Sequence, residues 1–401
     1  MTTHYFQRKL ALSITAASMA AGTASALEVP LTYFGTNMPP LDFHGFASQG
    51  YLASSDYNYL ANNTRNGSFK FTEAGVNMSV NPFPRTRIAA QGFTYDVGAA
   101  GQYDAVLDYA LAEYTFNDYI GVRAGRIRRA EGIYNDIQDL DLARTYVLLP
   151  QGMYNARWRD MYTTADGGEL FGTFHLGTGG RLAYQMYYGL QRPQLDGGLA
   201  IQKENLPPYQ QLNYFNSPQI VGGQLWWYTP LDGFRVGVAM NDDQDLTFQT
   251  VAGVRAEGSP FTQHYSLEYV VNKWTFQAEY YNSAVDYDIT LGGNHITTAK
   301  IHPDTWYAGA AYEVNRWFSV GTYYSEYYAD LTHRGGVGAT PSDGFQKDAA
   351  LSLRFDPTSW WVFKIEGHCI HGTAQLSDNR DNPVRNDNIW FMLAVKSTFS
   401  F

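Results

Sequence analysis

A strict alternation of apolar with polar or small side chains recurs along almost the whole chain and constrains its fold more than any other feature. The segment 234–241 reads FRVGVAMN, with Phe, Val, Val and Met on one face and Arg, Gly, Ala and Asn on the other. The segments 181–190 and 274–281 separate in the same way. A period of two is typical of β-strands, because successive side chains of a strand point to opposite faces. We therefore expect an all-β protein.

The number and spacing of these segments indicate whether the sheet closes on itself. Between clusters of Gly, Asn, Asp and Pro we count sixteen strands, at 41–53, 69–80, 86–97, 105–116, 119–129, 168–176, 181–190, 219–229, 234–241, 263–271, 274–284, 304–314, 317–327, 347–355, 360–371 and 388–401. Short turns alternate with longer loops between them. An even number of antiparallel strands can close into a barrel within one chain. The sequence thus predicts a transmembrane antiparallel β-barrel of about 16 strands.

The composition agrees with a barrel and excludes several other classes. An aromatic share of 16% is too high for a disordered chain. After residue 26, the longest apolar run has seven residues, at 306–312 and 389–395, whereas a membrane helix needs about 18. A net charge of -10 disfavours nucleic acid as a partner. A mean hydropathy of -0.33 fits strands that give half their side chains to lipid and half to water.

The N-terminus has the pattern of an export signal. Arg8 and Lys9 precede a small-residue apolar stretch, and Ala24, Ser25 and Ala26 match the A-x-A cleavage pattern. We interpret 1–26 as a signal peptide and 27–401 as the barrel domain, the alternative for 1–26 being a short packed helix. The single cysteine, Cys369, allows no internal disulfide.

Aromatic residues mark the expected rims of the barrel. They follow closely after short turns, as an aromatic girdle requires, at Tyr119, Trp274, Trp317, Trp360 and Trp361. A soluble sandwich or propeller also alternates, but it has no need of aromatics after each turn. The last strand ends on Phe401, which resembles the assembly signal of outer membrane β-barrel proteins of Gram-negative bacteria.

Together, the signal peptide, the strand count, a very long third loop and Phe401 resemble a Gram-negative porin. The similarity is strongest at 44–51, 124–150 and 157–173, which are similar to an uncharacterised branch of porin-like proteins, remotely related to phosphate-selective porins. The Pro-Glu-Phe-Gly-Gly motif of general enterobacterial porins is absent. The resemblance implies export through the periplasm to the outer membrane, contact with lipid and lipopolysaccharide, a homotrimer, and a water-filled channel for small hydrophilic solutes and ions.

The segment 130–167 is the candidate constriction, because the third loop of porins folds into the lumen. We expect an acidic loop opposite a basic wall, which creates a transverse field in the channel. The loop contributes Asp136, Asp139, Asp141 and Arg144, and the wall Arg87, Arg123, Arg126 and Arg181. The alternative is that the acids face bulk water or pair locally with Arg144.

Other functions stay open at this point. Dense arginines at 123–129 suit a selective channel for anions, phosphate or carboxylates, and equally a contact at the rim. A non-channel adhesive or structural barrel shares every fold feature. We expect no enzyme, since no GxSxG or HExxH motif occurs. We also expect no cofactor and no metal, because alternation puts His368 and Cys369 on opposite faces.

Overall fold

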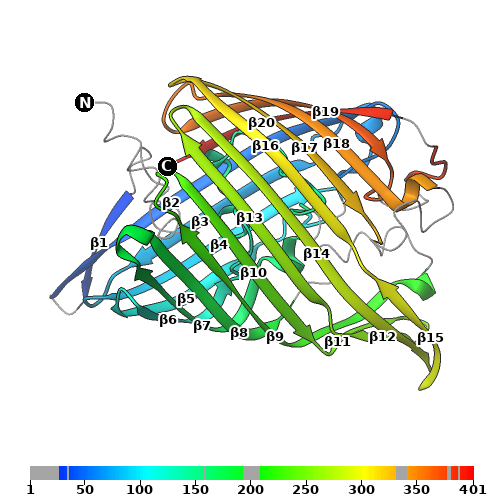
Figure 1. The fold of residues 1–401 in the computed structure, drawn as a ribbon, viewed down its shortest axis with the longest axis horizontal. Helices are drawn as coiled ribbons and strands as arrows, with labels where there is room; N and C mark the ends of the chain where they lie inside the picture. The colour runs from blue at the N-terminus through cyan, green and yellow to red at the C-terminus, as the bar shows by residue number, and fades with distance from the viewer. Residues whose placement is uncertain are drawn as a thin grey trace.

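The strands of the chain form one closed antiparallel barrel (Figure 1). The computed structural model describes residues 27–33, 36–98, 100–156, 159–192, 208–330, 341–376, 381–386 and 389–401. Sixteen strands make up the wall: β2 (Thr36–Ser54), β3 (Phe71–Val80), β4 (Thr86–Val97), β5 (Val106–Asn117), β6 (Ile120–Arg128), β7 (Thr164–His175), β8 (Arg181–Gln191), β9 (Leu212–Tyr228), β10 (Phe234–Gln244), β13 (Phe261–Val271), β14 (Trp274–Leu291), β16 (Asp304–Asn315), β17 (Phe318–Tyr328), β18 (Phe345–Phe355), β19 (Trp361–Gly372) and β20 (Ile389–Ser400).

The last wall strand pairs with the first and closes the barrel. Each wall strand pairs with the next along the chain, and β20 returns to β2 in a register that runs from Phe46 opposite Ser400 to Ser54 opposite Met392. The terminal residue adds to this seam, since Phe401 N and Gly45 O lie 3.0 Å apart. Closure leaves no unpaired edge in the wall. The predicted fold class and all sixteen strands are confirmed.

Four further strands lie outside the sixteen-stranded wall. The strand β1 (Leu27–Tyr33) pairs with the first part of β2. The strands β11 (Leu246–Thr250) and β12 (Val254–Gly258) pair with each other and with long extensions of β9 and β14, and β15 (Asn294–Ile301) pairs with the extension of β14. In Figure 1 they lengthen one side of the barrel beyond the rim that carries the long loops.

The sequence interpretation of these extensions was wrong. It assigned 242–262 and 285–303 to loops and began the strand of β9 at 219, whereas β9 begins at Leu212 and β14 ends at Leu291. The side chains of β15 are nearly all exposed. A strand that is exposed on both faces has no apolar periodicity, so the alternation that identified the wall does not identify the extension.

The two faces of the wall differ as the alternation predicts. On β19, Lys364, Glu366 and His368 are buried, whereas Cys369, the residue directly after His368, is exposed. On β20 the exposed side chains include Phe391, Leu393 and Phe399. Polar and charged groups therefore face inward and apolar groups outward, the reverse of a soluble sandwich. No helix among the described residues is long and apolar enough to cross a membrane.

Aromatic side chains gather on the outside near the short turns. Tyr119, Trp274, Trp317 and Trp360 are all exposed. Trp361 is half-buried and stacks on Phe399, with ring centroids 5.8 Å apart. Four of the five predicted girdle residues therefore face outward at the rim.

Candidate functional site

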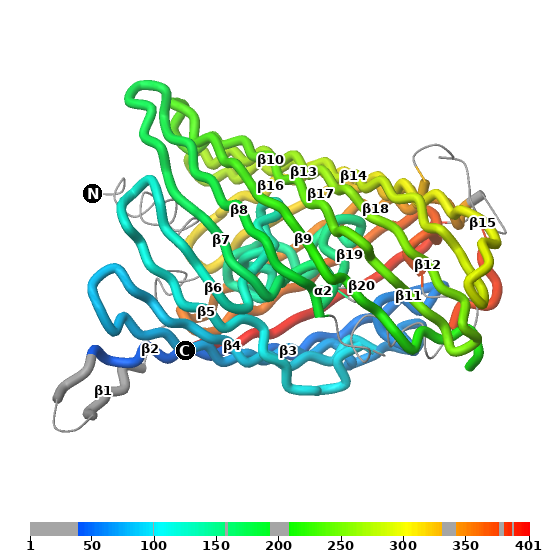
Figure 2. The backbone as a smooth tube through the Cα atoms, turned by 90° about the horizontal axis from the view of Figure 1, so that it is seen from below, coloured from blue at the N-terminus to red at the C-terminus, as the bar shows by residue number. Residues whose placement is uncertain are grey.

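The long connection between β6 and β7 touches the inner face of the wall on several sides (Figure 2). We call residues 129–163 the connecting segment. It contains three short helices, η2 (Asn135–Ile137), η3 (Asp141–Ala143) and α2 (Arg159–Tyr162). Its bonding partners are inward-facing residues of β4, β9, β14, β17, β18, β19 and β20.

On the β14 side, one buried carboxylate holds the connecting segment. Glu279 accepts hydrogen bonds from the backbone N–H of Ile133 at 2.9 Å and from the hydroxyl of Tyr154 at 2.6 Å. The hydroxyls of Tyr307 and Ser266 donate to the same carboxylate at 2.8 and 2.6 Å. Because four donors meet one ionised group away from water, this contact is both strong and directional.

On the β19 side, a second carboxylate plays the same part. Glu366 accepts from the backbone N–H groups of Val147 and Leu148, at 2.9 and 2.8 Å. His368 lies 3.1 Å from Glu366 and 3.0 Å from Asp348. These bonds satisfy backbone groups of an irregular segment that has no sheet partners of its own.

His368 and Cys369 lie on opposite faces of β19. His368 faces inward between two carboxylates, and Cys369 is exposed on the other face. Within the part of the chain that the structure describes, no group of three or more His, Cys, Asp or Glu residues is arranged to hold a metal ion.

Asp141 of the connecting segment is bound by two lysines from the last two strands. Lys364 of β19 lies 3.0 Å from its carboxylate and Lys396 of β20 lies 3.6 Å away. Thr398 donates a hydrogen bond of 2.7 Å, and Arg144 lies 3.7 Å away. Burial opposes ionisation of Asp141, but these cations outweigh it and hold the pKa of the carboxyl well below its usual range.

Asp139 is bound by two arginines at the ends of the same segment. Arg128 and Arg159 both form ion pairs with it, and Gln91 of β4 donates at 3.3 Å. The two arginines also pair with Asp108 of β5. Burial opposes ionisation of Asp139, yet Arg128 and Arg159 hold its pKa well below the usual range.

Asp136 is the one predicted loop acid for which the described residues give no ion pair. Its Oδ1 atom is buried without a hydrogen-bond partner among them. Burial raises the pKa of Asp136 to about 6, against the opposing effect of the nearby cations Arg123 and Arg128. This carboxylate therefore carries a charge that changes near neutral pH.

The predicted wall arginines mostly meet acids of the wall. Arg123 pairs with Glu113 at 2.5 Å and with Glu169 at 2.6 Å. Arg87 stands opposite Glu113 in the register of β4 and β5. Arg126 pairs with Asp166 at 2.6 Å, away from the acids of the connecting segment.

The remaining predicted cations also differ from the expected arrangement. Arg181 lies over the ring of Tyr228, 3.8 Å from its centroid. Arg144 donates to the backbone of Gln138 at 2.6 Å and lies near Asp141, so the local alternative holds in part for this acid.

Sequence reasoning missed the two lysines that bind Asp141. Lys364 and Lys396 occupy inward positions in strands that were predicted correctly, so the alternation of each strand alone assigns their side chains to the inner face. The sequence does not show that Asp141 is their partner, because 223 positions separate Lys364 from Asp141. Glu279 and Glu366 are missed for the same reason.

Comparison with solved structures identifies the architecture. Salmonella typhi OmpF in complex with daunomycin matches with a TM-score of 0.59 and 14% identity, over 93% of this chain and 100% of that one. The anion-selective porin from Comamonas acidovorans matches with a TM-score of 0.55 and 10% identity, over 90% and 99% of the two chains. OmpT of Vibrio cholerae, in a trimer form, matches with a TM-score of 0.54 and 12% identity, over 90% and 99%.

The comparisons by sequence, unlike the comparison by structure, find no match. No protein-family model matches the chain, and no curated protein matches it in sequence. At such low identities the solved structures establish the fold, which is that of outer membrane porins.

Proposed function

We propose that the protein is an outer membrane channel of a Gram-negative bacterium that lets small hydrophilic solutes and ions diffuse passively. The observation that carries the proposal is a closed sixteen-stranded wall with an apolar outer face and a charged inner face. In lipid, a closed barrel satisfies every backbone polar group. A barrel of this strand number encloses an aqueous lumen, whereas about eight strands are filled by side chains. Export through the periplasm after removal of 1–26 belongs to the same proposal.

The connecting segment is proposed as the constriction of this channel. Its support is the pair of carboxylates on distant strands, Glu279 and Glu366, which bind its backbone from two sides of the wall. A segment held at two places by strands on different sides of the lumen narrows the path for solutes. We assign the charge of the constriction to Asp136, because among the described residues it forms no ion pair, whereas Asp139 and Asp141 are paired with cations.

Conductance of the purified, folded protein tests the proposal. We expect steady single-channel steps in planar bilayers and swelling of liposomes in small sugars, dicarboxylates and phosphate. Electrical silence in a correctly folded sample would instead favour an adhesive or structural barrel. Turnover of lipid or peptide by the same sample would favour an enzyme.

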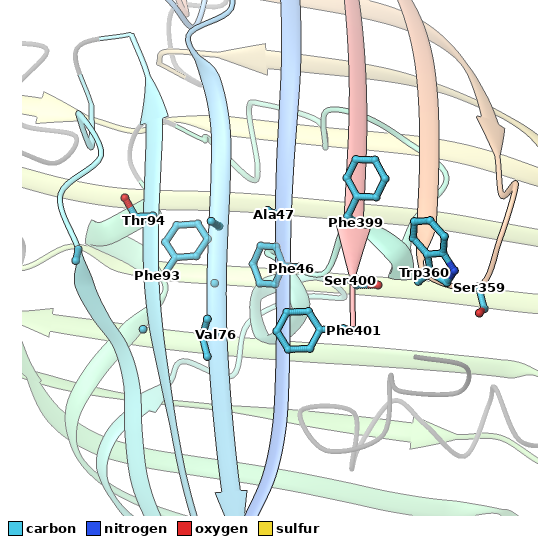
Figure 3. A pocket seen from close by; sticks show the side chains of 14 residues that line it. Phe46, Ala47, Val76, Phe93, Thr94, Ser359, Trp360, Phe399, Ser400 and Phe401 are labelled. Carbon is cyan, nitrogen blue, oxygen red and sulfur yellow. The ribbon is translucent and has the colours of Figure 1, made fainter. Parts of the chain in front are cut away.

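We also propose a homotrimer, in which a second copy packs on the outer face near the seam between β20 and β2. A hollow of about 910 Å³ lies there (Figure 3). Its outer part is lined by the small residues Ala47, Ala74 and Gly92, with Trp360 and Phe401 beside them. Small residues let another wall approach closely. One of the similar solved structures is a trimer form.

The oligomeric state after mild detergent extraction tests this second proposal. We expect the mass of three chains by light scattering, and we expect Ala47→Trp, which fills the hollow, to shift the mass toward one chain. A matched substitution on the outer face of β16, four wall strands from β20, Ala308→Trp, should leave the mass unchanged. A wild-type protein that runs as a single chain would contradict the trimer.

A further inference from the structure

Three arginines inside the barrel, Arg123 and Arg235 of the wall and Arg159 of α2, share one arrangement. The guanidinium carbon of Arg123 lies 4.2 Å from the ring centroid of Phe171, that of Arg235 4.4 Å from Trp226, and that of Arg159 4.1 Å from Phe93. At the edge of each guanidinium lies a carboxylate: Glu113 and Glu169 for Arg123, Glu268 for Arg235, and Asp139 with Asp108 for Arg159. In each, the ring fixes the plane of the guanidinium and the edge binds oxygen atoms.

Arg181 has the ring and lacks the carboxylate. Its guanidinium carbon lies 3.8 Å from the centroid of Tyr228, closer than in the other three stacks. Among the described residues, no carboxylate forms an ion pair with Arg181. Its side chain is half-buried, so the free edge of the guanidinium is open to solvent.

The position of Arg181 puts this free edge at one mouth of the barrel. Arg181 is the first residue of β8, directly after the short turn at 176–180, and it stands opposite Tyr228 in register. It shares the inward face of β8 with buried Ala183 and Tyr187. Solutes that leave or enter at the short-turn rim pass this face.

Neighbouring groups hold the stack and leave its edge unoccupied. Arg235 stands on the other side of Tyr228 in register, donates to its hydroxyl at 3.2 Å, and is itself paired with Glu268 at 2.8 Å. His175 stands opposite Arg181 on β7, and the exposed carboxylate of Asp118 lies 4.0 Å from that imidazole. Tyr228 is therefore held by Arg235 on the side away from Arg181.

We infer that Arg181 binds the oxyanion group, carboxylate or phosphate, of solutes at the short-turn mouth of the barrel. The planar fork of an arginine matches two oxygen atoms of either group, and stacking on Tyr228 presents this fork without loss of side-chain freedom on binding. Three other ring-stacked arginines, Arg123, Arg235 and Arg159, already bind carboxylates of the same chain in this way. The inference rests on the proposed channel function.

Block of ionic current by oxyanions tests the inference. Single channels of the full-length protein are recorded in chloride, with inorganic phosphate or succinate added to one side. We expect both probes to reduce the current in a concentration-dependent way. Arg181→Gln should raise the half-blocking concentration about tenfold, the loss expected of one charge-assisted contact. Arg181→Lys keeps the charge but not the planar fork. Its half-blocking concentration should lie between those of the wild type and Arg181→Gln.

The matched control is Arg316→Gln, which removes the same charge from an exposed turn on the same rim. We expect its half-blocking concentration to equal that of the wild type. Equal block of wild type and Arg181→Gln would overturn the inference, and block by only one probe would assign the site to phosphate or to carboxylates. A folded protein that conducts no ions would instead refute the channel. Broadening of the phosphorus NMR line of phosphate by wild type, but not by Arg181→Gln, then decides the site alone.

Discussion

Two acids of the connecting segment, only two positions apart, are anchored in opposite ways. Asp139 is bound by Arg128 and Arg159, which lie 11 and 20 positions away at the ends of the same segment. Asp141 is bound by Lys364, 223 positions away. We call these the near anchorage and the far anchorage.

The difference shows how assembly of the wall and docking of the segment are linked. The near anchorage uses groups from β4 to α2, so it needs only the first strands of the barrel. The far anchorage uses β19 and β20, so it exists only when the end of the chain has returned to β2. Bringing together residues that are far apart in the chain has an entropic cost. The far anchorage therefore forms only once the barrel is complete.

The two anchorages also differ in what remains when an acid is lost. Without Asp139, Asp108 still pairs with both arginines. Without Asp141, the fully buried Lys364 has no carboxylate partner among the described residues, and only Lys396 keeps one, Glu73 at 2.5 Å. Equal substitutions at the two acids should therefore have unequal effects.

The largest effect is expected from Asp141→Asn, which breaks the far anchorage. Loss of one partner leaves a buried charge uncompensated, which costs about 3 kcal/mol. We expect the connecting segment to leave its docked position, with a larger and noisier single-channel current, while the strand content measured by circular dichroism stays that of the wild type. Wild-type current noise in this variant would show that the far anchorage does not hold the segment.

A smaller effect is expected from Asp139→Asn, the same change in the near anchorage. Asp108 compensates Arg128 and Arg159, so the loss should be about 1 kcal/mol, the size of a single hydrogen bond. Current noise should lie between those of the wild type and Asp141→Asn. The double variant Asp108→Asn with Asp139→Asn should approach the noise of Asp141→Asn, and additivity of the two single changes would argue against the shared pairing.

The smallest effect on docking is expected from Asp136→Asn, because among the described residues Asp136 forms no ion pair with either anchorage and only its charge acts on Arg128. Because the pKa of Asp136 is raised to about 6, the wild type should lose cation preference as the pH falls from 7 to 5. The variant should show the low-pH selectivity already at pH 7, with a change of about twofold in the permeability ratio, as expected for one screened charge. Reversal potentials in a salt gradient measure this, and an unchanged pH step in the variant would remove Asp136 from the constriction.

The same titration separates selectivity from docking. Asp139 and Asp141 have lowered pKa values, so both stay ionised at pH 5 and both anchorages persist. The stability that these two acids contribute is lost only as the pH falls through their lowered pKa values. The pKa of Asp136 is raised and not lowered. Its contribution to the stability of the folded state therefore increases as the pH falls from about 6 toward 4.

The wall was predictable because its rule is local. Each strand has lipid-facing and lumen-facing positions that alternate, so Lys364 and Lys396 could be assigned to the inner face from parity alone. The strand β15 was not identified because alternation fails where both faces are exposed, and β11 and β12 were not identified because each has only five residues. The acids of the connecting segment were found by their position in a long loop.

The sequence by itself determined the barrel, its strand number, the direction of each side chain and the aromatic rim, since these follow from a period of two and from turn residues. The tertiary structure decided which charges meet. Asp141 was expected near Arg144 or the wall arginines; Arg144 does lie 3.7 Å away, but two lysines from the last strands lie closer. Arg181 was expected opposite the loop acids, and it stacks on Tyr228 at the mouth. Parity fixes the face that a residue occupies, but only closure of the barrel brings residues hundreds of positions apart to the same height in the lumen.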